Sequence, residues 1–312
     1  MTRAAWPLAV LLVLAGAPAC AAVPGASDPA PAASRSTPQR EPTRDPLADG
    51  PRRPTDAADA ARLLDAAMVE IIDPAASQDR IGLAGHVEQL AIREVSTHPR
   101  WTRRVLARLP RTFRDQVRSN VEARLAFRSM HPVSSADLAD ELPAWRILAP
   151  APATDLKRFY REAERRYGVD WEYLAAINLV ETAFGRIRGT SVAGAQGPMQ
   201  FLPSTWDIYG NGGDIDDPHD SILAAARLLR SNGFIRDKAS ALYRYNNSAA
   251  YVRGVSLHAQ VMQRQPRALL GYHAWQVYYL TERGSVWLEE GYAARRPIPV
   301  DRYLEQHPEA LP

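Results

Sequence analysis

One carboxylic acid, Glu181, lies at the end of the apolar face of a predicted helix, a position that suits a general acid. The residues Trp171, Leu174, Ile177 and Glu181 are spaced by three, three and four positions, so they share one face of a predicted helix. Burial at the end of this apolar stripe disfavours the carboxylate, and so does the negative end of the helix dipole. The sequence therefore predicts a raised pKa for Glu181, which suits proton donation near neutral pH. The alternative is an exposed glutamate at a fraying helix end.

The segment after Glu181 combines glycines with polar side chains in a regular order. Glycines at positions 185, 189, 194 and 197 permit tight turns and a close approach of the backbone to a ligand. Interspersed with them and directly after them are hydroxyl, amide and apolar side chains, namely Ser191, Gln196, Met199, Gln200 and Phe201.

These residues resemble the signature of the lytic transglycosylases with the goose-lysozyme-like fold. That signature has a Glu followed by Ser or Thr, a Ser about ten residues later, Gly-Ala-x-Gly, Met-Gln and Pro-x-Thr. The later segment Tyr243-Arg244-Tyr245-Asn246 resembles the Ala-Tyr-Asn motif of the same family. The resemblance covers roughly residues 147–265 and is closest to the membrane-bound B-type branch. Two residues depart from the pattern: Thr182 replaces the Ser of the soluble branch, and Arg244 replaces a small residue.

The resemblance implies a role for each matching residue. Glu181 is expected to be the sole acid/base, with Tyr245 and Asn246 beside it, and the glycan cleft is expected to be lined by Ser191, Gln196, Met199, Gln200 and Phe201. Hydroxyl and amide groups bind the polar groups of a sugar, and apolar side chains contact its apolar face. The implied reaction cleaves the β-1,4 bond between N-acetylmuramic acid and N-acetylglucosamine in peptidoglycan, forms a 1,6-anhydro ring and needs no cofactor. Alternatively, Met199 and Phe201 are core residues, and Ser191 and Asn246 are caps.

Two other functions remain open from the sequence. A hydrolysing muramidase would need a second carboxylate, for which the candidates are Asp214, Asp216 and Asp217. Asp217 before Pro218 is, however, also a natural helix N-cap. A non-catalytic cell-wall-binding lipoprotein is the other alternative, although such a protein would not need a buried acid.

Cap residues and changes in periodicity predict the elements that carry these groups. Helix starts are expected at Thr154, Asp170, Asp217, Asp237 and Ser248, and helix ends at Gly168 and Gly233. The helical periodicity over residues 56–73 and 78–95 predicts a helical N-terminal region, assigned to residues 56–146. After Pro266, Val277, Tyr279, Val286 and Leu288 flank a turn at 281–284, which predicts a β-hairpin extension over 266–312. The expected fold is therefore mainly α, with a lysozyme-like domain over 147–265.

The first fifty-five residues are expected to be a signal peptide followed by a disordered tether. Residues 1–20 combine Arg3, a short apolar run and small residues, which is typical of a secretory signal peptide. Its end, Ala17-Pro18-Ala19-Cys20, resembles a lipobox in which Cys20 becomes lipidated. Residues 21–55 are rich in proline and poor in large apolar residues, so disorder is expected there. The protein is thus expected to be exported to the cell envelope and anchored to the outer face of the membrane, facing the wall.

Composition excludes several classes of site. The chain has 312 residues and one cysteine, Cys20, so a disulfide framework or a cysteine-based metal site is excluded, and no metal is expected. The segment from Arg93 to Arg128 contains ten arginines and only three acidic residues. We favour a solvated helix face over a surface for anionic polymers. No nucleic-acid motif is present, and a net charge of +3 is modest for this length.

Overall fold

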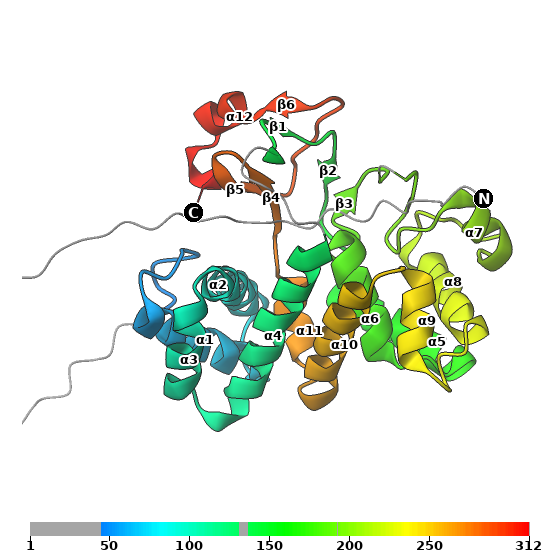
Figure 1. Cartoon of the computed structure of the whole chain (residues 1–312), viewed down its shortest axis with the longest axis horizontal. Helices are drawn as coiled ribbons and strands as arrows, with labels where there is room; N and C mark the ends of the chain where they lie inside the picture. Colours follow the sequence, from blue (N-terminus) through cyan, green and yellow to red (C-terminus); the bar gives the residue numbers. More distant parts are fainter. Residues whose placement is uncertain (1–44, 131–136, 192, 312) are drawn as a thin grey trace, which may run out of the picture.

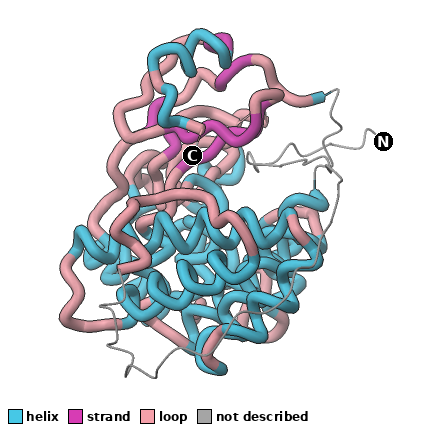
Figure 2. The backbone as a smooth tube through the Cα atoms, turned by 90° about the vertical axis from the view of Figure 1, so that its left-hand side faces the viewer, coloured by secondary structure: helices cyan, strands magenta, loops and turns pink. Residues whose placement is uncertain are grey.

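The computed structural model describes residues 45–130, 137–191 and 193–311 and is mainly α-helical, as the sequence predicts. The helices form the larger body of the molecule, and the short strands gather at one end of it (Figures 1 and 2). The signal peptide, Cys20 and residues 21–44 of the predicted tether lie outside the described residues. None of the described helices combines the length and apolar character that crossing a membrane requires.

The N-terminal region is helical from Ala57 to Met130, whereas the end of the range that the sequence analysis assigned to it contains the strand residues 141, 142 and 146. Asp56 caps its first helix by accepting hydrogen bonds from the backbone N–H groups of Ala58 and Asp59. Leu64 and Met68 on the buried face of this helix pack with Ile92 of the second. The helices are α1 (Ala57–Ile72), α2 (Gln78–Thr97), α3 (Pro99–Arg108) and α4 (Arg111–Met130).

The structure differs from the prediction at residues 45–55, which were expected to be disordered. Leu47 is fully buried among side chains of α1 and α2. Asp45 pairs with Arg80 at 2.8 Å, and Arg52 pairs with Asp59 at 2.6 Å. One buried leucine and two ion pairs with the helices therefore place this segment in the folded region, although its proline content resembles that of the preceding residues.

The arginine-rich stretch is only partly a solvated face. Six of its arginines are exposed, as expected: Arg100, Arg103, Arg104, Arg108, Arg111 and Arg118. Arg93 is only 6% exposed, and Arg124 lines a cavity. The favoured interpretation was wrong for these two residues, which lie on the inner faces of α2 and α4.

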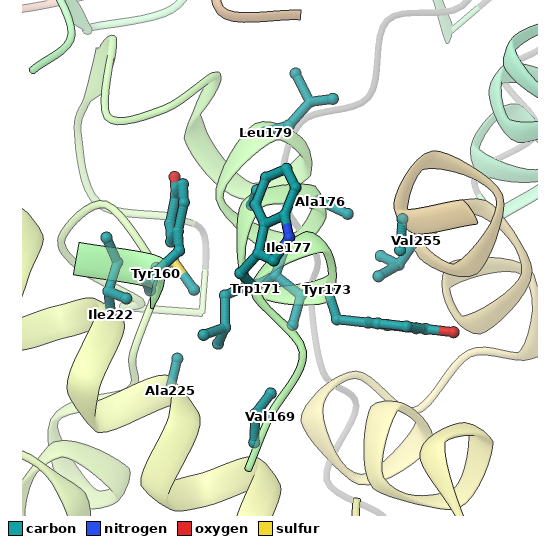
Figure 3. Close-up of a cluster of buried hydrophobic side chains, with 14 of the residues drawn as sticks. Tyr160, Val169, Trp171, Tyr173, Ala176, Ile177, Leu179, Ile222, Ala225 and Val255 are labelled. Atoms are coloured by element: carbon teal, nitrogen blue, oxygen red, sulfur yellow. The ribbon is translucent and has the colours of Figure 1, made fainter. Parts of the chain in front are cut away.

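The central helix of the molecule is α6 (Trp171–Thr182). Ten of its twelve residues are buried. Figure 3 shows its side chains Trp171 and Ile177 within a cluster to which Tyr160, Ile222 and Val255 contribute from neighbouring helices. The neighbours are α5 (Ala153–Tyr167), α8 (Pro218–Ser231) and α10 (Ala249–Arg264), with α7 (Pro203–Tyr209) and α9 (Lys238–Tyr245) beside them. A helix enclosed in this way holds the residue at its end, Glu181, in a fixed place.

Most of the predicted caps are confirmed. Gly168 adopts φ 68° after α5, and the side chains of Asp217, Asp237 and Ser248 accept hydrogen bonds from the first turns of α8, α9 and α10. Gly233 adopts φ 85° two residues after α8.

Two predicted caps were wrong in detail. Helix α5 begins at Ala153, one residue before Thr154, because Pro152 occupies the N-cap position without a side-chain bond. Asp170 does occupy the N-cap of α6, but its carboxylate pairs with Lys238 instead of a backbone N–H. The ammonium group of Lys238 thus takes the place of the backbone N–H group that was expected to bind Asp170.

The C-terminal residues form the predicted hairpin, and residues 137–148 pack with it in one unit. Strands β4 (Val277–Thr281) and β5 (Gly284–Leu288) are antiparallel, with Thr281 opposite Gly284. Strand β6 (Ile298–Pro299) pairs with β1 (Glu141–Leu142), and β2 (Arg146–Ile147) pairs with β3 (Ile187–Arg188). Leu142, Trp145 and Ile147 share one apolar core with the hairpin. We call this unit, residues 137–148 with 275–311, the strand lobe; it includes α12 (Val300–Gln306) and η2 (Pro308–Ala310). Helix α11 (Ala268–His273) precedes it.

Candidate active site

Glu181 lies in the last turn of α6 and is 8% exposed. Its Oε1 accepts a hydrogen bond of 2.8 Å from the hydroxyl of Tyr251. Burial raises the pKa of Glu181 to about 7, and the hydrogen bond from Tyr251 opposes that shift only in part. The predicted raised pKa is confirmed, with burial as its cause. A group with this pKa can donate a proton near neutral pH and can then accept one.

The chain reverses sharply directly after Glu181. Ala183, Phe184 and Gly185 all adopt positive φ, a conformation that costs a non-glycine residue about 1–3 kcal/mol. Thr182 holds this turn, since its hydroxyl donates to the carbonyl of Pro198 (2.6 Å) and accepts from the N–H of Gly185 (2.9 Å). The hydroxyl after the acid therefore ties the turn to the glycine-rich loop.

Glu181 faces a narrow cavity of about 20 Å³. This is room for about one water molecule. The cavity is adjacent to a larger groove of about 920 Å³, with which it shares Ile187, Gly189 and Thr190. The volume of the groove is that of a site for an extended ligand. The acid thus lies in a small recess beside a large groove.

Of the sequence-predicted residues, Ser191 and Gln200 line the recess with Glu181. The Ser191 hydroxyl accepts from the N–H of Ala195 at 2.9 Å, and Gln200 Nε2 donates to the carbonyl of Gly197 at 3.1 Å. Gln196 lines the groove instead of the recess. Its backbone forms a two-way bridge with Phe201, which fixes the loop.

The structure places Met199 and Phe201 in the core, not on the surface of the cleft. Met199 is fully buried, and Phe201 packs edge-on against Trp206 at 5.4 Å between ring centroids. Both side chains therefore pack in the core beneath the loop, which is the alternative that the sequence left open, and neither lines the recess or the groove. The bridge between Gln196 and Phe201 leaves the amide side chains of the loop facing the cavities and turns the apolar ones inward.

Tyr245 stacks on Tyr251, which is the hydrogen-bond partner of Glu181. The two rings are parallel with centroids 6.3 Å apart, and the Tyr245 hydroxyl donates to the carbonyl of Met199 at 2.6 Å. Burial and the nearby Glu181 both raise the pKa of Tyr245, which keeps its hydroxyl neutral. The Oδ1 of Asn246 is buried and has no hydrogen-bond partner, so an acceptor is available there.

The sequence analysis missed two residues of this site. Tyr251 is the hydrogen-bond partner of the acid, yet it comes from the first turn of α10, outside the motif. Trp145 comes from the strand lobe and forms a wall of the recess. Its ring packs edge-on against Tyr279 at 5.6 Å, and a Cβ placed on Gly189 would lie 2.7 Å from it. The glycine at 189 therefore makes room for an indole.

The three candidate second acids do not line the recess in the described part of the chain. Asp217 caps α8, and Asp214 accepts from the N–H of Asp216. The carboxylate of Asp216 lies 3.7 Å from Arg188 in the larger groove. Asp217, His219 and Asp220 bring ligand atoms within 4.8 Å of one another, but both carboxylates already accept hydrogen bonds from backbone N–H groups.

Comparison with known proteins identifies the region that holds the acid. Residues 158–267 match the family model described as the transglycosylase SLT domain. This part of the chain is therefore similar to the transglycosylase SLT domain, in the region where the sequence motifs place that resemblance. Over 80 residues, the chain is 36% identical to the membrane-bound lytic murein transglycosylase F of Thiobacillus denitrificans. That alignment covers 26% of this chain and 17% of the relative's own length. No solved structure matches the chain significantly.

Proposed function

We propose that this protein is a lytic transglycosylase that cleaves the β-1,4 bond between N-acetylmuramic acid and N-acetylglucosamine in peptidoglycan. The observation that carries the proposal is the buried carboxyl of Glu181, with a pKa of about 7, in a recess beside a groove of about 920 Å³. The SLT match over residues 158–267 and the name of the curated relative support the same reaction.

In the proposed mechanism, Glu181 works first as an acid and then as a base. The protonated carboxyl donates its proton to the bridging oxygen, and the bond from that oxygen to C1 of the muramoyl ring breaks. The muramoyl N-acetyl group assists this departure. The C6 hydroxyl of the same sugar then bonds to C1 and gives its proton to Glu181, which closes the 1,6-anhydro ring. The attacking group is part of the substrate, so its effective concentration is high, and the recess has no second carboxyl among the described residues.

The larger groove suits the rest of the substrate. It is lined by Arg146, Arg188 and Arg295 and by one acidic residue, Asp216. This excess of positive charge favours carboxylates, such as those carried by the peptides of peptidoglycan. Gln196 contributes an amide to the same groove, where it can bind hydroxyl or N-acetyl groups.

The decisive experiment is mass spectrometry of the muropeptides that the purified protein releases from peptidoglycan. The expected products are one water lighter than hydrolysis products. Products with a free reducing end would instead establish a muramidase, and Asp216→Asn would then be the variant to examine. A folded protein that binds peptidoglycan and releases no product would contradict both reactions and leave a non-catalytic wall-binding protein.

Trp145→Ala is expected to raise KM for glycan strands by about tenfold, because a sugar whose bridging oxygen reaches Glu181 would have to pack against the indole that walls the recess. Steady-state kinetics on purified glycan strands measure the effect, with kcat changing less than KM. Trp145→Phe, which keeps an aromatic wall, should recover most of the affinity. Trp101→Ala in the N-terminal helices is a matched control outside both cavities. An unchanged KM for Trp145→Ala would remove the indole from the binding site.

We also propose that the protein acts in the cell envelope after export, anchored through Cys20. The proposal rests on the sequence of residues 1–20, with support from the word "membrane-bound" in the name of the relative. Labelling cells with a radioactive fatty acid, with Cys20→Ala as the control, tests the anchor directly.

A further inference from the structure

A third cavity lies where the N-terminal helices meet the SLT domain and the strand lobe, and it has a volume of about 140 Å³. Its walls come from α2, α4, α6, α10 and β4. Leu179 and Val180 on the α6 wall are within one turn of Glu181. None of the residues that we assign to the glycan-binding recess or groove lines this cavity, except Ile187 at its edge.

Two arginines provide the charge of this cavity. Arg93 on α2 is 6% exposed, donates to the hydroxyl of Ser285 and has its guanidinium 4.4 Å from the centre of the Tyr278 ring. Arg124 on α4 donates through Nε to the hydroxyl of Ser96 at 3.0 Å, and its Nη2 is buried without a hydrogen-bond partner. Neither guanidinium has a carboxylate partner in an ion pair among the described residues.

The surrounding charges do not neutralise this pair. Arg53 adds to the positive potential at Arg93, and the nearby carboxylate of Glu94, which opposes it, already pairs with His98 at 3.3 Å. The carboxyl of Glu88 bonds to Asn120 and Trp275 of the cavity wall, and burial raises its pKa to about 7, which favours its neutral form. Burying a guanidinium group without an opposite charge costs several kcal/mol, and this applies to the Arg93 side chain and to the Nη2 end of Arg124. An anion bound between the two guanidinium groups would remove this cost and would satisfy Nη2 of Arg124.

The remaining walls define the rest of the ligand. They are mainly apolar, with Ile92, Phe127, Leu179 and Val277 among them. A cavity of about 150 Å³ accepts a benzene ring, so about 140 Å³ suits an apolar body of that size. We propose that this cavity is a binding site for an organic carboxylate, whose anionic group lies between Arg93 and Arg124 and whose apolar part contacts Phe127 and Leu179. An inorganic phosphate would leave the apolar walls without contacts.

The test uses benzoate and its neutral analogue benzamide. Benzoate is expected to raise the Tm of the protein with the logarithm of its concentration, as a ligand that binds the folded state does, whereas benzamide is expected to leave it almost unchanged. N-acetylalanine, a probe for the carboxyl end of a peptide, should act like benzoate, and inorganic phosphate should act more weakly. Calorimetric titration of the same probes gives the affinities without any turnover.

Arg124→Gln is expected to weaken benzoate binding about tenfold through the loss of a charge-assisted hydrogen bond, and Arg124→Lys should weaken it less. Arg103→Gln on the exposed face of α3 is the matched control and should bind normally. Equal effects of benzoate and benzamide, tighter binding of phosphate, or an unchanged affinity in Arg124→Gln would each overturn the proposal. These measurements do not depend on glycan cleavage. A failure of the carboxylate site can therefore be distinguished from a failure of the proposed function.

Discussion

Glu181→Gln is expected to lower the rate of glycan cleavage by about 10²–10⁴-fold, the range for loss of a general acid/base. The amide cannot supply the proton that the bridging oxygen needs, nor accept one from the C6 hydroxyl. The carboxamide oxygen can still accept the hydrogen bond from Tyr251, which is 2.8 Å from Glu181 Oε1. The fold around the recess should therefore be retained while cleavage is lost. Release of soluble muropeptides under saturating substrate measures the rate.

Glu181→Gln is also expected to change the way in which the free energy of unfolding depends on pH. The pKa of Glu181 is about 7 in the folded state against an ordinary value of 4.5, so the folded state keeps its proton where the unfolded chain has lost it. The stability of the wild type therefore falls as the pH rises from about 4.5 to about 7 and stays lower above that. Gln does not ionise, so above pH 7 the variant should be more stable, by up to about 3 kcal/mol.

Urea denaturation of both proteins across the pH range measures this difference, and Glu305→Gln, at an exposed position in α12, is the control that should change neither activity nor stability. If Glu181→Gln were active, Glu181 would not be the acid. If it were inactive but without the pH-dependent gain in stability, the carboxyl would not be buried with a raised pKa, and its loss of activity would need another cause.

Gly197→Ala is expected to cost about 3 kcal/mol or more of the free energy of unfolding, from backbone strain and steric overlap combined. Gly197 has φ 72°, and a Cβ there would lie 2.0 Å from the carbonyl oxygen of Ile215. That oxygen belongs to the backbone, so no side-chain rotation relieves the overlap. The loop would have to move away from Ile215, and Gln200, whose Nε2 donates to the carbonyl of Gly197, would move with it.

Gly212→Ala separates the cost of backbone strain from the cost of steric overlap. Gly212 has φ 78°, close to that of Gly197, but a Cβ there would have nothing within 4 Å. Its cost should be only the conformational one, about 1 kcal/mol. Chemical denaturation of the two variants gives the comparison. Equal costs would mean that the loop adapts freely and that the contact with Ile215 does not constrain the site.

Local signals predicted much of this site. The apolar stripe of α6 ends at Glu181, and the caps at Asp217, Asp237 and Ser248 depend on a few neighbouring residues, so the sequence shows them directly. Whether Met199 lines the cleft or packs in the core depends instead on the direction of its side chain in an irregular loop. The backbone of that loop is joined by the bridge between Gln196 and Phe201, a contact that no periodic pattern reveals.

The residues that were missed depend on contacts between distant parts of the chain. Tyr251 reaches Glu181 across seventy positions of sequence, and nothing near Tyr251 indicates its partner. Trp145 reaches the recess because the strand lobe packs there, and the lobe combines segments that lie far apart in the sequence. Leu47 follows the same rule, since its burial among Leu63 and Val87 overrides the proline-rich composition around it.

The strand lobe has a consequence for how the protein matures. The carbonyl of Trp145 accepts from the N–H of Ala294, and the carbonyl of Pro143 accepts from the hydroxyl of Tyr292. The indole wall beside Glu181 can therefore be fixed only after Tyr292 and Ala294 have been synthesised, long after Glu181 itself. A chain whose synthesis has passed Glu181 but has not reached Tyr292 would carry the acid in an incomplete recess.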